Sequence, residues 1–175
     1  MKRSITAFAF IFLLSCSKDS DNTESGPYIK YTAGTTQFEF KGNANAVITG
    51  NEGVYVTKFP GNVSVGTVTQ YLLMGQKDLS TGIRFEIDAD SLKTELYHCY
   101  QRPMYGSPAK VAFSGKAYST FATDGSQKIS VQITRHSKGT ADGTFQGTLY
   151  SFDTPAIPME IKNGEFKNVP VVYYQ

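Results

Sequence analysis

Residues 96–106 hold the residue types best suited to chemistry in this sequence. The stretch contains a histidine, a thiol, an arginine and three tyrosines. Tyrosine rings give a large contact area at a low cost in conformational entropy, and sugars and peptides commonly lie on such rings. We therefore predict a recognition loop with five candidate binding residues: Tyr97, His98, Tyr100, Arg102 and Tyr105. The alternative is a loop whose tyrosines only cover one end of the fold.

Cysteine catalysis is poorly supported in the same stretch. His98 and Cys99 are adjacent, so in a strand their side chains point to opposite faces of the sheet. A nucleophile needs its base within hydrogen-bond reach, and His136 meets that need only if folding brings it to Cys99. We expect Cys99 to be a small buried apolar residue, and we predict no catalytic residue.

The acidic residues do not predict a metal site. Asp88 and Asp90 lie two residues apart and could face one calcium ion at a strand end. Calcium takes about six to eight oxygen ligands, and no further donors cluster nearby. We therefore interpret them as solvated loop acids and predict no metal and no cofactor. A pair of carboxylates for glycoside hydrolysis stays open as an alternative, because folding can bring any two acids together.

The amino terminus has the order of a bacterial lipoprotein signal. Lys2 and Arg3 precede an apolar segment, residues 5–14, of signal-peptide length; a helix that spans a bilayer needs roughly 20 apolar residues. Leu13-Leu14-Ser15-Cys16 then resembles a lipobox. The resemblance implies that residues 1–15 are removed and that Cys16 carries the acyl chains of a stable membrane anchor. The alternative is an ordinary secretory signal with an incidental cysteine.

Residues 16–26 are small, polar and charged. Such a segment cannot bury enough apolar surface to offset its ordering entropy, so we predict a flexible tether. Its charged residues are similar to the surface-export signals of Bacteroidota lipoproteins, which implies an outer-membrane location with the cell surface favoured over the periplasmic face. Asp90-Ser91-Leu92 also resembles a short O-glycosylation sequence of exported Bacteroidota proteins, which makes Ser91 a candidate modification site.

The charge balance argues against nucleic acid as a partner. The whole chain carries 17 basic and 15 acidic residues. Lys2 and Arg3 leave with the predicted signal peptide, so the basic residues of the mature chain fall to 15 and its formal net charge is zero. Nucleic-acid binding would require clustered basic residues, and no such stripe runs along the sequence. If Cys16 is lipidated, Cys99 has no partner for an internal disulfide.

Apolar and polar residues alternate with a period of two from residue 28 onward, a pattern typical of half-buried strands. We predict one antiparallel β-sandwich, jelly-roll or immunoglobulin-like, over residues 27–175. At most one short helix is expected, at residues 89–98. Residues 111–123 are expected to form one long strand bent at Gly115. Turns are expected at seven sites: Gly34-Thr35, Gly50-Asn51, Pro60-Gly61-Asn62, Thr81-Gly82, Asp124-Gly125, Asp142-Gly143 and Asn163-Gly164.

The end of the chain carries a second resemblance. Residues 143–149, GTFQGTL, and residues 161–166, IKNGEF, resemble the ending of small Bacteroidota lipoproteins of unknown function. The resemblance implies a penultimate strand rich in glycine and threonine and a closing Asn-Gly hairpin. It implies no activity.

These observations favour a membrane-anchored, non-enzymatic module that binds or displays something, with a glycan or a protein as the candidate ligand. Two other functions stay open: a small hydrolase that acts on glycans or peptides, and a structural accessory subunit of an outer-membrane complex. The oligomeric state does not follow from the sequence.

Overall fold

The computed structural model describes residues 26–42, 52–59, 70–99, 109–113, 116–119, 129–137, 139–151 and 155–173. All regular structure in these ranges is β-strand, which confirms the predicted all-β class. The strands are β1 (Tyr28–Ala33), β2 (Thr36–Lys41), β3 (Gly53–Phe59), β4 (Gln70–Asp78), β5 (Thr81–Asp88), β6 (Leu96–Cys99), β7 (Ala109–Phe113), β8 (Lys116–Ser119), β9 (Ile129–Ser137), β10 (Thr140–Ser151) and β11 (Pro158–Tyr173). Within the described ranges, no helix is long and apolar enough to cross a membrane.

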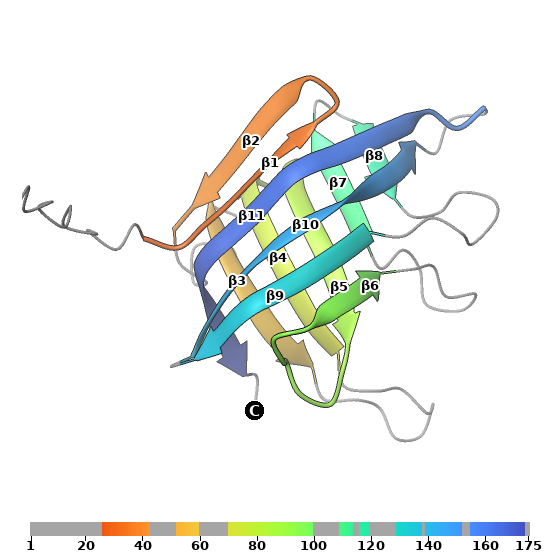
Figure 1. Ribbon diagram of the computed structural model, residues 1–175. Helices are drawn as coiled ribbons and strands as arrows, with labels where there is room; N and C mark the ends of the chain where they lie inside the picture. Colours follow the sequence, from red (N-terminus) through yellow and green to blue (C-terminus); the bar gives the residue numbers. More distant parts are fainter. Residues whose placement is uncertain are drawn as a thin grey trace, which may run out of the picture.

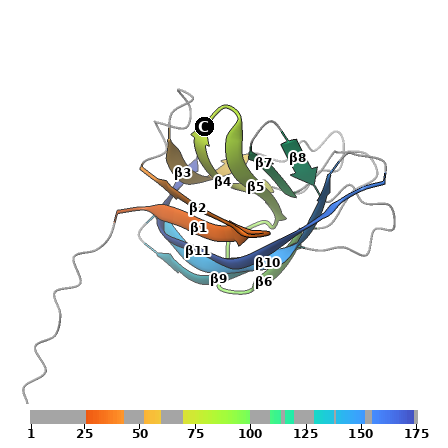
Figure 2. The ribbon, with the colours of Figure 1, turned by 90° about the horizontal axis from the view of Figure 1, so that it is seen from above.

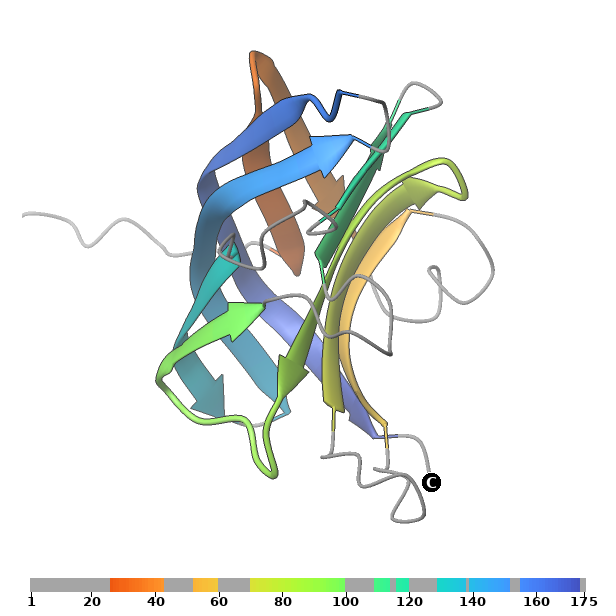
Figure 3. The ribbon, with the colours of Figure 1, turned by 90° about the vertical axis from the view of Figure 1, so that its right-hand side faces the viewer.

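The strands form two curved layers. Hydrogen bonds connect them in the order β2-β1-β11-β3-β4-β5-β7-β8-β10-β9-β6, and β10 also pairs with β11. Starting from β11, the hydrogen-bonded strands follow one another as β3, β4, β5, β7, β8 and β10. Because β10 pairs with β11 again, this series of strands closes on itself. Figure 3 shows the first layer, which contains β2, β1, β11, β10, β9 and β6, facing the second, which contains β3, β4, β5, β7 and β8. Figure 1 shows the first layer in front, and Figure 2 shows both layers curving around one interior.

The interior is filled by the apolar members of the alternating strands. Phe85 on β5 meets Phe145 on β10, with ring centroids 4.7 Å apart, so the two layers are in direct contact. Gly75 on β4 leaves space for Phe40 and Ile29 of the first layer. Because every second residue of a strand faces the same side, the alternation in the sequence predicts this buried face correctly.

Strand β11 connects the two layers. It pairs antiparallel with β1 on one edge and with β10 on the other, and its end pairs with β3. The pairing with β3 is parallel, so the expectation of a purely antiparallel fold is wrong at this point. The pairing with β1 stops where Tyr28 opposes Lys167, which leaves the rest of that edge of β11 to β3.

Asn163-Gly164 is not the predicted closing hairpin, because both residues lie inside β11. Gly164 opposes Phe145 and Ile161 opposes Gly147, so β11 carries one extra residue against β10 at this point. Asn163 has a φ of 52°, in the left-handed region. Asparagine tolerates that region, which serves a β-bulge as well as a hairpin turn. The Asn-Gly dipeptide therefore does mark a residue with positive φ, but that residue forms a β-bulge and not a hairpin turn.

Other turn and helix expectations are corrected in the same way. Asp142-Gly143 lies inside β10, next to another shift of register. Thr81-Gly82 begins β5, and the turn before it lies at Leu79 and Ser80. Residues 111–123 do not form one strand, because Phe113 of β7 pairs back onto Lys116 of β8. Residues 90–95 form bends where a short helix was expected, and β6 follows them.

Two glycines allow β10 and β11 to pack aromatic rings across each other. A Cβ atom on Gly164 would collide with the carbonyl oxygen and ring of Phe145. A Cβ atom on Gly143 would collide with the ring of Phe166 and the carbonyl oxygen of Gln132. A phenylalanine of each strand therefore packs over a glycine of the other strand. This contact fixes the register between β10 and β11. The predicted glycine- and threonine-rich penultimate strand is β10, which confirms that expectation.

Replacing Gly164 by alanine is expected to destabilise the fold by about 1–3 kcal/mol or more, because the added methyl group meets main chain that cannot move aside. Urea unfolding followed by circular dichroism measures the change. Gly26→Ala is the matched control, since nothing lies within 4 Å of a Cβ atom there. Equal unfolding free energies for the two variants would contradict this account of the β10–β11 contact.

Candidate functional site

The outer face of the first layer brings together polar side chains from distant parts of the sequence. Residues that oppose each other in neighbouring strands share a face of the sheet. One row crosses the whole layer in this way: Leu96, Gln132, Thr144, Glu165, Lys30 and Glu39. His98, Ser130 and Gln146 form a shorter parallel row beside it.

Charge is divided unevenly over this face. The half formed by β2, β1 and β11 carries four ion pairs: Lys30–Glu165 at 2.6 Å, Lys41–Glu39 at 3.2 Å, Lys162–Glu160 at 2.9 Å and Lys167–Glu165 at 3.4 Å. Exposed pairs of this kind stabilise little, but they offset most of each other's charge: four lysines face three glutamates, because Glu165 pairs with both Lys30 and Lys167. The half formed by β6, β9 and β10 presents mainly uncharged side chains: Leu96, Ser130, Gln132, Thr144, Gln146 and Thr148.

A hollow of about 360 Å³, here called the neutral hollow, lies over the uncharged half. Its lining is Leu96, Ser130, Gln132, Thr144, Phe145, Gln146, Asn163 and Gly164. Asn163 also lines two neighbouring hollows, one over β1 and β2 and one between β10 and β11. The bulge at Asn163 therefore lies where three depressions of the outer face meet.

The polar groups of the neutral hollow are partly oriented in advance. Gln132 Nε2 donates a hydrogen bond to the Ile133 carbonyl oxygen at 2.9 Å, and Ser130 Oγ lies 3.2 Å from His98 Nδ1. Within the described ranges, the side chains of Thr144, Gln146 and Asn163 have no hydrogen-bond partner in the protein. Amides and hydroxyls both donate and accept, so this set can pair with either kind of group on a ligand.

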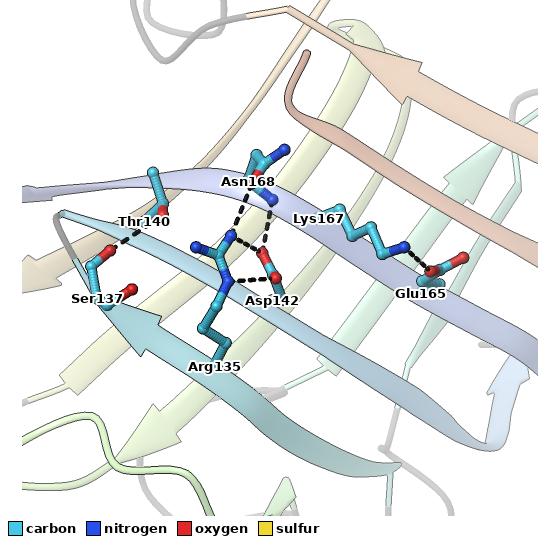
Figure 4. A network of polar contacts seen from close by, with 7 residues as sticks. All are labelled: Arg135, Ser137, Thr140, Asp142, Glu165, Lys167 and Asn168. Atoms are coloured by element: carbon cyan, nitrogen blue, oxygen red, sulfur yellow. Dashed lines mark hydrogen bonds and ion pairs between the residues drawn. The ribbon is translucent and has the colours of Figure 1, made fainter. Parts of the chain in front are cut away.

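A charged network joins β9, β10 and β11 (Figure 4). Its residues Arg135 and Asp142 lie three and two positions along their strands from the lining residues Gln132 and Thr144. Arg135 donates to both carboxylate oxygens of Asp142, from Nε at 2.6 Å and from Nη2 at 2.8 Å. Arg135 Nη2 also donates to Asn168 Oδ1 at 2.7 Å, and the Asn168 backbone N–H donates to Asp142 at 2.7 Å. Burial raises the pKa of Asp142, but the donors from Arg135 and Asn168 outweigh it and hold that pKa below its usual value.

The predicted recognition residues do not share one surface. Tyr97 points into the core, where its hydroxyl accepts from the Lys93 N–H at 2.8 Å and burial raises its pKa. Its ring is therefore not a contact surface, because alternation turns it inward. His98 is exposed and lies beside the neutral hollow. Ser91 is exposed. Tyr100, Arg102, Tyr105 and Cys16 lie outside the described residues.

Cys99 and His136 do not form a nucleophile and base. Cys99 is 1% exposed, and burial, with a smaller effect from the charge of Glu86, raises its pKa to about 12. His136 Nδ1 lies 2.9 Å from the Leu92 carbonyl oxygen. Cys99 opposes Ile129, seven residues before His136 on β9, which corresponds to about 23 Å at about 3.3 Å per residue. The expected burial of Cys99 is confirmed.

Among the residues that the structure describes, no group of three or more His, Cys, Asp or Glu side chains could hold a metal ion. Asp90 is exposed, and the Asp88 side chain lies outside the description. The residues of the neutral hollow were not singled out from the sequence. Their only local signal is the lack of charge at four outward positions, Ser130 and Gln132 on β9 and Thr144 and Gln146 on β10. These four residues form one surface only because β9 and β10 lie side by side.

Comparison with known proteins adds no relative: no protein-family model, curated protein or solved structure matches this chain. The two lipoprotein resemblances of the sequence stay predictions.

Asp142→Asn tests the charged network through pH. The pKa of Asp142 is lower in the folded than in the unfolded chain, so its stabilising effect is complete above the unfolded pKa, about 3.9, and is lost as the pH falls toward the folded value. We expect the variant to lose about 1–2 kcal/mol of unfolding free energy at pH 7 and to approach the parent protein in acid below about pH 4.

Urea titrations at pH 7, 5, 4 and 3 measure this difference, with Asp90→Asn as the control for an exposed carboxylate outside the network. A difference that stays constant from pH 7 to pH 3 would contradict the assigned role of Asp142.

Proposed function

We propose that this chain is a lipid-anchored, non-enzymatic binding module of the cell surface and that its neutral hollow is the binding site. The observation that carries the proposal is the hollow itself, an uncharged depression on the sheet. Among the described residues, its side chains of Thr144, Gln146 and Asn163 have no hydrogen-bond partner in the protein. Binding sites commonly combine an apolar lining with a few well-placed polar groups.

The hollow suits recognition better than catalysis. Its lining contains no carboxylate, imidazole or thiol. General acid–base catalysis needs a side chain that gains and loses a proton near neutral pH, and nucleophilic catalysis needs an activated nucleophile. One hydroxyl of the lining, Ser130, does have a base beside it, since His98 Nδ1 lies 3.2 Å from its Oγ. Among the described residues, no carboxylate hydrogen-bonds to that exposed imidazole to orient it as a base. The remaining hydroxyl and amides of the lining have no base beside them. Binding uses the same groups unchanged, as donors and acceptors with fixed positions.

The supporting strands hold the hollow in place. Its residues come from β6, β9, β10 and β11, which are joined by continuous backbone hydrogen bonds. The Arg135–Asp142–Asn168 network ties three of these strands together. Sites on strands keep their geometry more precisely than sites on loops.

The tether of the proposed anchor would reach the domain away from the hollow. Residues Gly26 and Pro27 lie against β1 and β2, in a depression that they share with Tyr28, Lys30, Glu39, Lys41 and Gly42. Strand β11 separates β1 from β10, which places β10 about 10 Å from β1 at a spacing of about 4.8 Å per strand. The first described residues of the chain therefore lie on β1 and β2, with β11 between them and β10.

Cys16→Ala tests the anchor. The variant is expected to lose the lipid and move from the membrane fraction to the soluble fraction, since acyl methylenes supply the membrane affinity, about 0.8 kcal/mol each. Cell fractionation with immunoblotting measures the distribution, and Cys99→Ala is the matched control for loss of a thiol. A Cys16→Ala protein that stays with the membranes would show that the anchor is not at this residue.

A glycan and peptide array tests binding itself, with chain freed from the membrane by Cys16→Ser. We expect specific binding that survives Tyr100→Ala and Tyr105→Ala, because the proposal places the ligand in the hollow. If no glycan or peptide binds, the proposed function is wrong. If binding is lost with the two tyrosines, the function stands and the loop is the site.

A further inference from the structure

We infer that the neutral hollow takes an uncharged oligosaccharide and that Asn163 is the centre of its binding surface. This inference rests on the proposed function and names the ligand class of the same site. Three properties of the hollow carry it: its charge, its place in the sheet and its continuity with neighbouring hollows.

The charge of the surroundings favours a neutral ligand. All eight lining residues are uncharged. Charged side chains on the surrounding strands are already paired, Lys30 with Glu165 and Arg135 with Asp142. Lys162, next to Asn163 on β11, is paired with Glu160. An anionic or cationic ligand would lose hydration without meeting an unpaired opposite charge in the lining. An uncharged ligand that is rich in hydroxyls avoids this cost.

The place of the hollow in the sheet favours a sugar over an extended peptide. Peptides commonly bind sheets by adding a strand at an edge, where main-chain groups are free. Here β10 lies between β9 and β11, so its main-chain groups are used by the ladders on both sides. Recognition must then use side chains, and the amides of Gln132, Gln146 and Asn163 match the donor and acceptor groups of sugar hydroxyls.

The hollow also offers an apolar contact. Leu96 lies on its rim and is 51% exposed. A sugar ring carries a face of C–H groups beside its hydroxyls, so a leucine next to a row of amides and hydroxyls complements both parts of it. A strongly polar ligand without such a face would leave Leu96 in water.

The position of Asn163 favours a chain of sugars over a single one. The neutral hollow, the hollow over β1 and β2 and the hollow between β10 and β11 all include Asn163 in their lining. Bulges re-aim a side chain relative to the regular pleat, and this one occurs at a non-glycine residue with positive φ. A linear oligosaccharide could therefore extend from one hollow into the next across the Asn163 amide.

Isothermal titration calorimetry tests the inference on the mature chain with Cys16→Ser. The probes are neutral hexasaccharides of α-1,4-linked glucose, β-1,4-linked glucose and α-1,6-linked mannose, together with an acidic hexasaccharide of galacturonic acid. Asn163→Gly removes the amide and keeps a residue that tolerates positive φ. Gln146→Ala removes a second amide from the exposed surface, and Thr36→Ala on β2 is the control outside the three hollows.

We expect at least one neutral hexasaccharide to bind more tightly than the acidic one. Asn163→Gly and Gln146→Ala should each raise its dissociation constant by about tenfold, and Thr36→Ala should leave it unchanged. Thermal unfolding identifies any variant that fails to fold. If only Asn163→Gly unfolds, an unchanged affinity in Gln146→Ala still overturns the inference.

The remaining outcomes separate this inference from the proposed function. Tighter binding of the acidic hexasaccharide overturns the inference, and so does a ligand whose affinity neither amide variant changes. In both cases the chain is still a binding module. If the chain binds only peptides on the array, the inference is also overturned, and the proposed function still stands. If no glycan or peptide binds in any assay, both are wrong.

Discussion

The pairing of β10 with β11 is the constraint on which the rest of the structure depends. Each strand places a phenylalanine over a glycine of the other, and a methyl group at either glycine would meet main chain. The rings of Phe145 and Phe166 lie with their centroids 6.5 Å apart, and Phe145 reaches Phe85 in the second layer. Through its other edge β11 holds β1 and then β3, so this pairing joins both layers. A change of register here would shift β10, β9 and β6 relative to β11, β1 and β2.

The same pairing creates the outer surface that we propose binds ligand. Because β11 carries extra residues at its bulges, Asn163 and Asn168 leave the regular pleat. Asn168 hydrogen-bonds with Arg135 and Asp142 in the network that connects β9, β10 and β11. Asn163 instead lines the hollows of the outer face. The interior aromatic packing thus supports an exterior of small and polar residues. The uncharged part of this face is the surface on which the proposed binding function rests.

The strands and their buried faces largely follow from the sequence, but which strands pair with each other does not. Period-two alternation placed the strands around Phe40, Val56, Phe85 and Val131 correctly, since burial on one face is a local property of a strand. Asn163-Gly164 was misassigned because a hairpin and a bulge both need a positive φ, and only the neighbouring strands decide between them. Tyr97 was assigned to a binding loop for its residue type, but its alternation with His98 turns it into the core. The hollow escaped prediction because its residues come from four strands spread along the chain.

The sequence by itself determined the all-β class, the buried face of most strands and the burial of Cys99, because each depends on neighbours a few residues apart. It also carries the segment around Cys16 that resembles a lipobox, a pattern that is contained in a few consecutive residues. Only the tertiary structure decided that β11 pairs with three strands, that His136 lies far from Cys99 and that Gln132, Gln146 and Asn163 share one surface. These relations depend on register between distant segments, and register is settled by the packing of the whole core, which no single stretch of sequence contains.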